Sequence, residues 1–232
     1  MSVRSRLGRL PWVKALRVAV NDWTDGGYQK SYAQEGEDLI LGRYFEYAPP
    51  GFYVDVGAHD PRRFSNTFLL QRRGWRGINI DATPGSMRRF RAARPRDINL
   101  ECAVGATAGT ATLFQFNEPA LNTLDGTLVP LYESHGYCVV AKQSILVRPL
   151  AEILAEYVPP GQAIQLMSVD VEGFDLQVLQ SNDWGRFRPQ VLVVESLKDA
   201  PLHSAALSAF LDEHSYRLFA QTVNSRFYET GQ

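Results

Sequence analysis

The sequence predicts an α/β protein built on a doubly wound, mainly parallel seven-stranded sheet with an antiparallel edge strand. Short runs of β-branched and aromatic residues alternate with helix-like stretches along the chain. The first strand-like runs start roughly 20 to 26 residues apart, which suits right-handed βαβ units. Two further strand-like runs close the pattern and can pair as a hairpin at the edge of the sheet.

Three strands and two helices are predicted in the first half of the chain. The turn Pro49-Pro50-Gly51 precedes the first strand, Ser65 is a good cap for the first helix, and Pro84 suits the opening turn of the second. Pro95 ends that second helix, because the residue before a proline avoids the helical region. In order, the elements are strand 52–56, helix 66–73, strand 77–80, helix 84–94 and strand 98–100.

The second half returns to this alternation after a long irregular stretch. Residues 110–116 alternate like a strand, but 117–144 mix polar and aromatic residues without a clear helical period. A connection of that length in a compact domain is usually a lid or a binding loop. The later elements are helix 150–157, strand 164–169, helix 174–180, strand 191–194, a helix with an apolar stripe at Leu207, Phe210 and Leu211, and a closing hairpin of 216–220 with 226–228.

Length and composition indicate one domain over 28–232 with a substrate-side insertion at about 117–144. The chain has 232 residues, of which 45% are hydrophobic, so it can bury a core without disulfides or a structural metal. Cys102 and Cys138 are expected as free thiols, which fits a reducing compartment. No apolar stretch approaches the ~20 residues that span a bilayer, so a cytoplasmic protein is expected.

Basic residues are unevenly distributed, although the formal net charge is only −1. Ten arginines between Arg62 and Arg96 stand against a single acid, Asp81. Such a stretch is either a solvated surface or an attraction for an anionic partner. Residues 1–27 form a basic segment in which 1–20 could be an amphipathic helix. That helix either packs on its own domain or makes peripheral contact with the inner face of a membrane.

Acidic residues end or follow most of the predicted strands. In doubly wound sheets, ligands bind beyond the carboxyl ends of the strands, near the point where the strand order reverses. A single acid at one strand end could be a helix cap or a salt bridge, but a whole set is harder to explain in that way. The set consists of Asp55, Asp81, Glu101, Asp170 with Glu172, and Glu195.

The first two strands predict the kind of nucleotide. Asp81 could accept hydrogen bonds from both ribose hydroxyls of an adenosine, or it could cap the helix that Pro84 opens. A pyrophosphate site needs three glycines and no negative charge, whereas this loop has only Gly57 in place and carries Asp55. S-adenosylmethionine has no phosphate and carries an ammonium and a sulfonium, so an acidic loop suits it. The sequence therefore favours a methyltransferase over a nucleotide-dependent oxidoreductase.

Four segments taken together resemble the FkbM-type methyltransferase family. They are SYAQEGEDL at 31–39, YVDVGAHDP at 53–61 with Ser65-Asn66-Thr67, GWRGINID at 74–81, and VDVEG at 169–173. The resemblance implies a class I, Rossmann-like methyltransferase fold, S-adenosylmethionine as donor, and O-methylation of a sugar, glycolipid, polysaccharide or secondary metabolite. One departure is Asp81 followed by Ala82-Thr83-Pro84, where the family more often has Glu and then Pro.

The resemblance also implies which residues hold the cofactor. Gln34 and Glu37 would close over its methionine end, although they could instead cap the helix around Gly36. The other candidates follow the first, second and third strands. They are Asp55, Gly57, His59 and Asn66 or Thr67 on the methionine side, Asp81 at the ribose, and Cys102 and Ala103 at the adenine.

Methyl transfer to a hydroxyl needs a base or a cation, because a neutral hydroxyl is a poor nucleophile. His59 and His135 are candidate bases, although either could be an ordinary structural histidine. Asp170 or Glu172 could bind the hydroxyl or take its proton. Asp170 and Glu195 end neighbouring strands, and their hard oxygen ligands would suit Mg²⁺.

The expected partner is a small-molecule or glycan acceptor. A nucleic-acid methyltransferase is an alternative suggested by the arginines, but the sequence has no Asn-Pro-Pro-aromatic motif for amino-group chemistry. No nucleic-acid partner is therefore expected.

Overall fold

The computed structural model describes residues 29–196 and 201–231. The basic segment expected at 1–27, with its proposed membrane contact, lies outside the described residues. Residues 32–232 form the larger of two compact units, and this unit carries every element discussed below. None of the helices in the described ranges is both long and apolar enough to cross a membrane.

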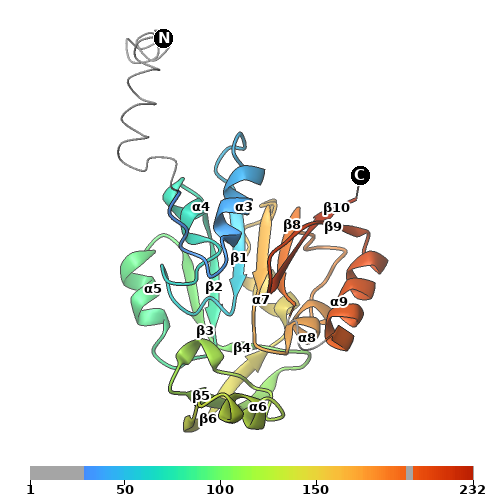
Figure 1. The fold of residues 1–232 in the computed structure, drawn as a ribbon. Helices are drawn as coiled ribbons and strands as arrows, with labels where there is room; N and C mark the ends of the chain where they lie inside the picture. The colour runs from blue at the N-terminus through green and yellow to red at the C-terminus, as the bar shows by residue number, and fades with distance from the viewer. Residues whose placement is uncertain (1–28, 197–200, 232) are drawn as a thin grey trace, which may run out of the picture. The chain divides into compact units, whose positions relative to one another are not determined.

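A seven-stranded sheet forms the centre of this unit (Figure 1). The strands are β1 (Phe52–Val56), β2 (Arg76–Asp81), β3 (Ile98–Glu101), β7 (Leu166–Val169), β8 (Val191–Glu195), β9 (Tyr216–Gln221) and β10 (Ser225–Thr230). Their order is β3-β2-β1-β7-β8-β10-β9, and all neighbours from β3 to β8 are parallel. β10 pairs antiparallel with both β8 and β9. The predicted mainly parallel sheet with an antiparallel edge is confirmed.

Helices cover both faces of the sheet, as a doubly wound fold requires. They are α3 (Glu37–Tyr44), α4 (Phe68–Arg72), α5 (Met87–Ala93), α7 (Leu150–Tyr157), α8 (Asp175–Gln180) and α9 (Pro201–Glu213). Val54 and Val56 of β1 belong to the core formed with α7, α8 and α9, whereas Tyr53 belongs to the core formed with α3 and α4. Successive β1 side chains therefore bury into two different cores.

The central strands are buried on both faces. All of β1, all of β7 and the first four residues of β8 are buried. Strands of this kind read as near-continuous apolar runs, which is why the sequence predicts them. The polar exceptions, Asp55 and Ser168, occupy paired positions near the carboxyl ends of β1 and β7. Polar groups thus enter these strands close to the edge where ligands are expected.

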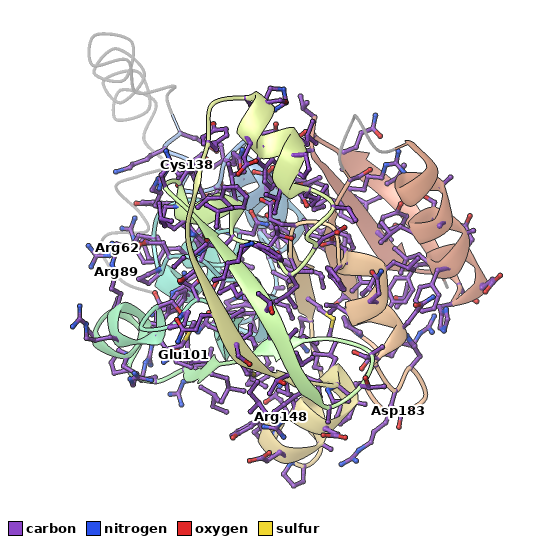
Figure 2. All side chains as sticks on the ribbon, turned by 90° about the horizontal axis from the view of Figure 1, so that it is seen from below. Arg62, Arg89, Glu101, Cys138, Arg148 and Asp183 are labelled. Atoms are coloured by element: carbon purple, nitrogen blue, oxygen red, sulfur yellow. The ribbon has the colours of Figure 1, made fainter. Side chains whose placement is uncertain are left out.

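A second, three-stranded sheet lies at the edge where the parallel strands end (Figure 1). It consists of β4 (Ala103–Val104), β5 (Gly109–Phe116) and β6 (Val139–Arg148), in the order β4-β6-β5. Between β5 and β6 the chain forms η1 (Pro119–Leu121) and α6 (Val129–Ser134). Seen from below, the long β5–β6 ribbon crosses the molecule and has α6 at one end (Figure 2).

Several element boundaries differ from prediction, among them the start of β7, which is Leu166 instead of residue 164. Residues 139–144 of the expected insertion belong to β6, whose first half is largely exposed and so lacks the alternation of a half-buried strand. Helix α4 begins at Phe68, two residues later than predicted, although Ser65 Oγ does accept a hydrogen bond from the Phe68 N–H at 3.2 Å. Pro84 lies in a turn, and α5 begins only at Met87.

Candidate active site

Two adjoining cavities open where the parallel strands end. They share Ala120, Asp170 and Glu172 in their linings. The inner cavity is narrow and offers about 70 Å³ to the centre of a water-sized molecule, whereas the outer cavity offers about 410 Å³. The inner cavity is also lined by Gly57, His59, Asp81, Cys102, Ala103 and Asn122, and the outer cavity by Gln34, Glu37, Arg63, Asn66, Tyr132 and Glu195.

Gly57 lets the strand ends approach one another closely. It follows β1 with a φ of +80°, and a Cβ atom at this position would lie 1.7 Å from the carbonyl oxygen of Asp170. The N–H groups of Gly57 and Ala58 both donate to the carbonyl oxygen of Ile80, at 2.9 and 3.0 Å. Glycine is therefore required for space as well as for conformation. The turn joins the ends of β1, β2 and β7 beside the inner cavity.

Asp81 fixes two loops at the inner cavity. Its Oδ2 accepts a hydrogen bond from the backbone N–H of His59, and its Oδ1 accepts one from that of Thr83, each at 2.8 Å. A carboxylate has about four lone-pair sites, so each oxygen can accept a further bond from a ligand. Asp81 therefore anchors the turn before α5 and also faces the cavity with acceptor capacity to spare.

A buried arginine supports the loop after β1 from behind. Arg94 is fully buried and donates to Thr67 Oγ1 at 2.8 Å, to Ser65 Oγ at 2.8 Å and to the carbonyl oxygen of Pro61 at 2.6 Å. Thr67 in turn donates to Asp55 Oδ2 at 2.6 Å. Burial raises the pKa of Asp55, while the Thr67 hydrogen bond and Arg94 oppose that shift. Asp55 and Thr67 thus hold the loop and are not among the described residues that line either cavity.

The two predicted histidines have different positions. His59 lines the inner cavity with a φ of +52°. Burial lowers the pKa of its imidazole, so the ring is neutral at pH 7. His135 follows α6, is exposed, and does not line the two cavities as the structure describes them. Only His59 is therefore brought to the candidate site.

The motif before α3 meets the closing hairpin beside the outer cavity. Asn224 donates to Glu35 from its backbone N–H and from its Nδ2, both at 2.9 Å. Glu37 is buried, and its Oε1 accepts hydrogen bonds from the hydroxyls of Thr222 and Ser225, each at 3.2 Å. Glu35 and Glu37 therefore clamp two distant parts of the chain together while they line the cavity.

Three acids meet where the two cavities join. One carboxylate oxygen from each of Asp170, Glu172 and Glu195 lies within 4.8 Å of the other two, and we call this group the carboxylate centre. Tyr132 donates to Glu172 at 2.5 Å. The buried Oε2 of Glu195 has no hydrogen-bond partner among the described residues. Glu172 also adopts a φ of +52°, and such strained backbone clusters at functional sites.

Negative charge dominates this part of the structure. Six carboxylates line the outer cavity, and Arg63, the one cationic side chain in its described lining, already donates to Glu118 at 3.3 Å. Asp170 is open to the cavity, yet the surrounding protein and repulsion from Glu172 raise its pKa. Burial and the neighbouring acids likewise raise the pKa of Glu195. The carboxylate centre therefore fits a cationic ligand, such as a sulfonium, an ammonium or Mg²⁺.

The insertion reaches the site through hydrogen bonds of its own. Besides the bond from Tyr132, the Thr123 hydroxyl donates to the carbonyl oxygen of Glu172 at 2.8 Å. Asn122 Nδ2 donates to the Thr83 hydroxyl at 3.1 Å, beside the inner cavity. The insertion thus contacts both the strained Glu172 and the loop that Asp81 anchors.

A family model described as the methyltransferase FkbM domain matches residues 55–218. The matched region includes all three members of the carboxylate centre, together with Gly57, Asp81 and the insertion. No curated protein matches the sequence.

Proposed function

The chain belongs to the FkbM methyltransferase family, and from this premise we propose that it is an S-adenosylmethionine-dependent O-methyltransferase. Its acceptor would be a hydroxyl of a sugar, a glycolipid, a polysaccharide or a secondary metabolite. The observation that carries the proposal is the meeting of the two cavities at the carboxylate centre. The inner cavity is then the site of the cofactor's adenosine. The outer cavity would hold the acceptor and also the methionine end of the cofactor, which Gln34, Glu37 and Asn66 would contact, with Asp170 and Glu172 between the two.

The inner cavity suits an adenosine that carries no phosphate. Ile80, Leu113 and Phe174 supply apolar walls, and Asp81 faces the cavity. None of the described residues in this lining is a lysine or an arginine, so a pyrophosphate would have no cationic partner there. Bound S-adenosylmethionine would supply a methyl group activated by its sulfonium. The charge of the cavity thus supports a methyltransferase over a nucleotide-dependent oxidoreductase.

Asp170 is the residue that we place at the reacting hydroxyl. It lies in the wall shared by the two cavities, where its carboxylate can orient the hydroxyl and take its proton. Because its pKa is raised, it is a stronger base near neutral pH than an ordinary aspartate. A cationic cofactor beside them would in turn favour the ionised forms of Glu172, which is held by Tyr132, and of Glu195.

The outer cavity favours a neutral or cationic acceptor. Its described lining has six carboxyl groups and a single guanidinium, that of Arg63, so it offers little to the phosphates of a nucleic acid, which supports the expectation of a small-molecule or glycan acceptor. The exposed rings of Phe64 and Tyr137, which line the same cavity, offer apolar contact to the carbon face of a sugar ring.

We further propose that the carboxylate centre can hold Mg²⁺. Its three carboxylates offer the hard oxygen ligands that this ion prefers, and Glu195 Oε2 lacks any other partner among the described residues. An ion bound there would lower the pKa of an acceptor hydroxyl.

Mg²⁺ is expected to raise the melting temperature of the protein, and EDTA is expected to abolish its activity. The raised pKa values mean that Asp170 and Glu172 bind more protons in the folded protein than in the unfolded chain, so their contribution to stability falls as the pH rises from about 4 to 8 without a cation. At pH 8 the stabilisation by Mg²⁺ should occur in the wild type and in Glu101→Gln and be absent in Glu195→Gln. Full activity in EDTA, together with no effect of Mg²⁺ on the melting temperature, would refute the metal proposal and leave the methyltransferase proposal standing.

Asp81→Ala is expected to weaken cofactor binding by roughly tenfold or more, because a charge-assisted hydrogen bond contributes about 1.5 to 3 kcal/mol. Titration calorimetry with S-adenosylmethionine measures this directly. Glu101→Ala is the matched control, since Glu101 pairs with Asp81 in register, is exposed and labelled in Figure 2, and is not among the described residues of either cavity. Unchanged affinity in Asp81→Ala would contradict the ribose assignment.

A further inference from the structure

A further cavity lies at the opposite edge of the sheet from the carboxylate centre. It offers about 380 Å³ to the centre of a water-sized molecule and is lined by residues at the starts of β1, β2 and β3 and in the loop after α7. Arg76 and Arg96 are the charged side chains in its described lining, and no carboxylate joins them there. We call this cavity the amino-edge groove.

The two arginines occupy matching positions on neighbouring strands. Arg76 begins β2, and Arg96 precedes β3 by two residues. Since Ile78 pairs with Ile98 in the parallel register, Arg76 and Arg96 stand at corresponding places just before that pair. Like charges at corresponding positions of adjacent strands repel each other and destabilise the pairing.

Nothing on the described protein surface neutralises this pair of charges. Both side chains are exposed, and neither makes a side-chain hydrogen bond or an ion pair with any residue in 29–196 or 201–231. The adjacent acid, Asp97, is turned toward the interior, where it accepts hydrogen bonds from the Tyr53 hydroxyl and from Asn79 Nδ2. The groove is therefore a concave site with two unpaired positive charges.

We propose that Arg76 and Arg96 bind a phosphate group in the amino-edge groove. A guanidinium presents a planar fork of N–H donors that matches the oxygen atoms of a phosphate, and two such groups can hold one phosphate between them. A bound phosphate would also relieve the repulsion between the two arginines. The phosphate can belong to a soluble phosphorylated compound or to a lipid headgroup, and the chemistry of recognition is the same. This proposal is independent of methyl transfer.

The test compares two pairs of arginines in the full chain. One double variant is Arg76→Gln/Arg96→Gln. The control is Arg88→Gln/Arg91→Gln, which removes the same charge from exposed residues of α5 that have no side-chain partner among the described residues and do not line the groove. Because all four side chains are exposed, the melting temperatures should stay close to that of the wild type. The two single variants at Arg76 and Arg96 serve if the first double variant does not fold.

Titration calorimetry with inorganic phosphate, at an ionic strength held constant with NaCl, reports binding. Wild type and control should bind phosphate with similar affinity, and Arg76→Gln/Arg96→Gln should bind at least about tenfold more weakly, as expected for the loss of charge-assisted bonds. Absence of binding by the wild type would overturn the proposal. Equal weakening in both double variants would overturn it as well, since it would mean that only the net charge matters.

Vesicle pelleting separates the two sources of phosphate. The proteins are mixed with vesicles of phosphatidylcholine alone and with vesicles that also contain phosphatidic acid. Loss of pelleting on phosphatidic acid vesicles in Arg76→Gln/Arg96→Gln, but not in the control, identifies a lipid headgroup. Unchanged pelleting together with weakened binding of inorganic phosphate identifies a soluble ligand. Any membrane attraction from residues 1–20 is common to all the proteins compared.

Discussion

Asp170→Asn is expected to lower turnover by roughly a hundredfold or more while cofactor affinity changes by less than about tenfold. The substitution keeps the shape of the side chain but removes its charge and its capacity to take a proton. Both properties matter mainly in the transition state. Cofactor affinity should change much less, because the asparagine side chain keeps the wall that Asp170 provides to the two cavities. Single-turnover rates and titration calorimetry with S-adenosylmethionine separate the two effects.

Glu101→Gln is the control for Asp170→Asn. It removes a carboxylate at another strand end, and Glu101 is exposed and absent from the described linings of both cavities. Turnover should therefore stay at the wild-type level. A fully active Asp170→Asn enzyme would eliminate Asp170 both as a base and as a metal ligand. Loss of cofactor affinity in proportion to turnover would instead assign Asp170 to cofactor binding.

Replacement of residues 118–137 by an Asn-Gly turn is expected to abolish methyl transfer and to keep cofactor affinity within about tenfold. The structure makes this design possible, because the Asn117 N–H donates to the carbonyl oxygen of Cys138 at 3.1 Å and the Cys138 N–H donates to Asn117 Oδ1 at 3.0 Å. A two-residue turn can therefore close the β5–β6 hairpin. The replacement removes Tyr132 and Tyr137 from the outer cavity. It also removes Pro119, Ala120, Asn122 and Leu124 from one wall of the inner cavity, but it keeps the strand-end residues there, Gly57, Asp81, Cys102 and Ala103.

Tyr132→Phe is the gentler companion of this replacement. It keeps the ring, which packs edge-to-face on Phe116 at 5.3 Å between centroids, and it removes only the donor to Glu172. Turnover should fall by about tenfold, as expected for one charge-assisted hydrogen bond.

The protein with residues 118–137 replaced also tests the role of the insertion. If it loses cofactor affinity and thermal stability together, the insertion is a structural element and not a cover for the acceptor.

The fold was predictable where burial alone decides it. Strands such as β1 and β8 are buried on both faces, so their apolar runs indicate strands without any tertiary information. The start of β6 gave no such signal, because its side chains are exposed and it is held by pairing with β5, a partner more than twenty positions away for most of its residues. Nothing in the neighbouring sequence indicates that Arg94 is buried either. It stands among arginines that reach solvent, and only the loop that folds over it makes it a buried donor.

Part of the candidate site was predictable because the carboxyl ends of parallel strands share one edge. That rule brings Asp81, Asp170 and Glu195 to the cavities, and it is correct for these positions. It does not say which way a side chain points. Asp55 reaches Thr67, behind the cavities, and Glu101 reaches solvent. The bond from Tyr132 to Glu172 spans 40 positions, so no pattern in the sequence indicates it.

The hydrogen bonds between the motif before α3 and the closing hairpin have a consequence for folding during synthesis. The lining of the inner cavity ends at Phe174. Thr222, Asn224 and Ser225, which hold Glu35 and Glu37, come much later and follow all the other strands of the domain except the rest of β10. At roughly 5 to 20 residues per second, a growing chain spends seconds with the apolar edge of β8 unpaired, and such an edge is a template for wrong pairing. The lining of the inner cavity is thus complete in the growing chain before that of the outer cavity, which also needs Asn224 and Ser225.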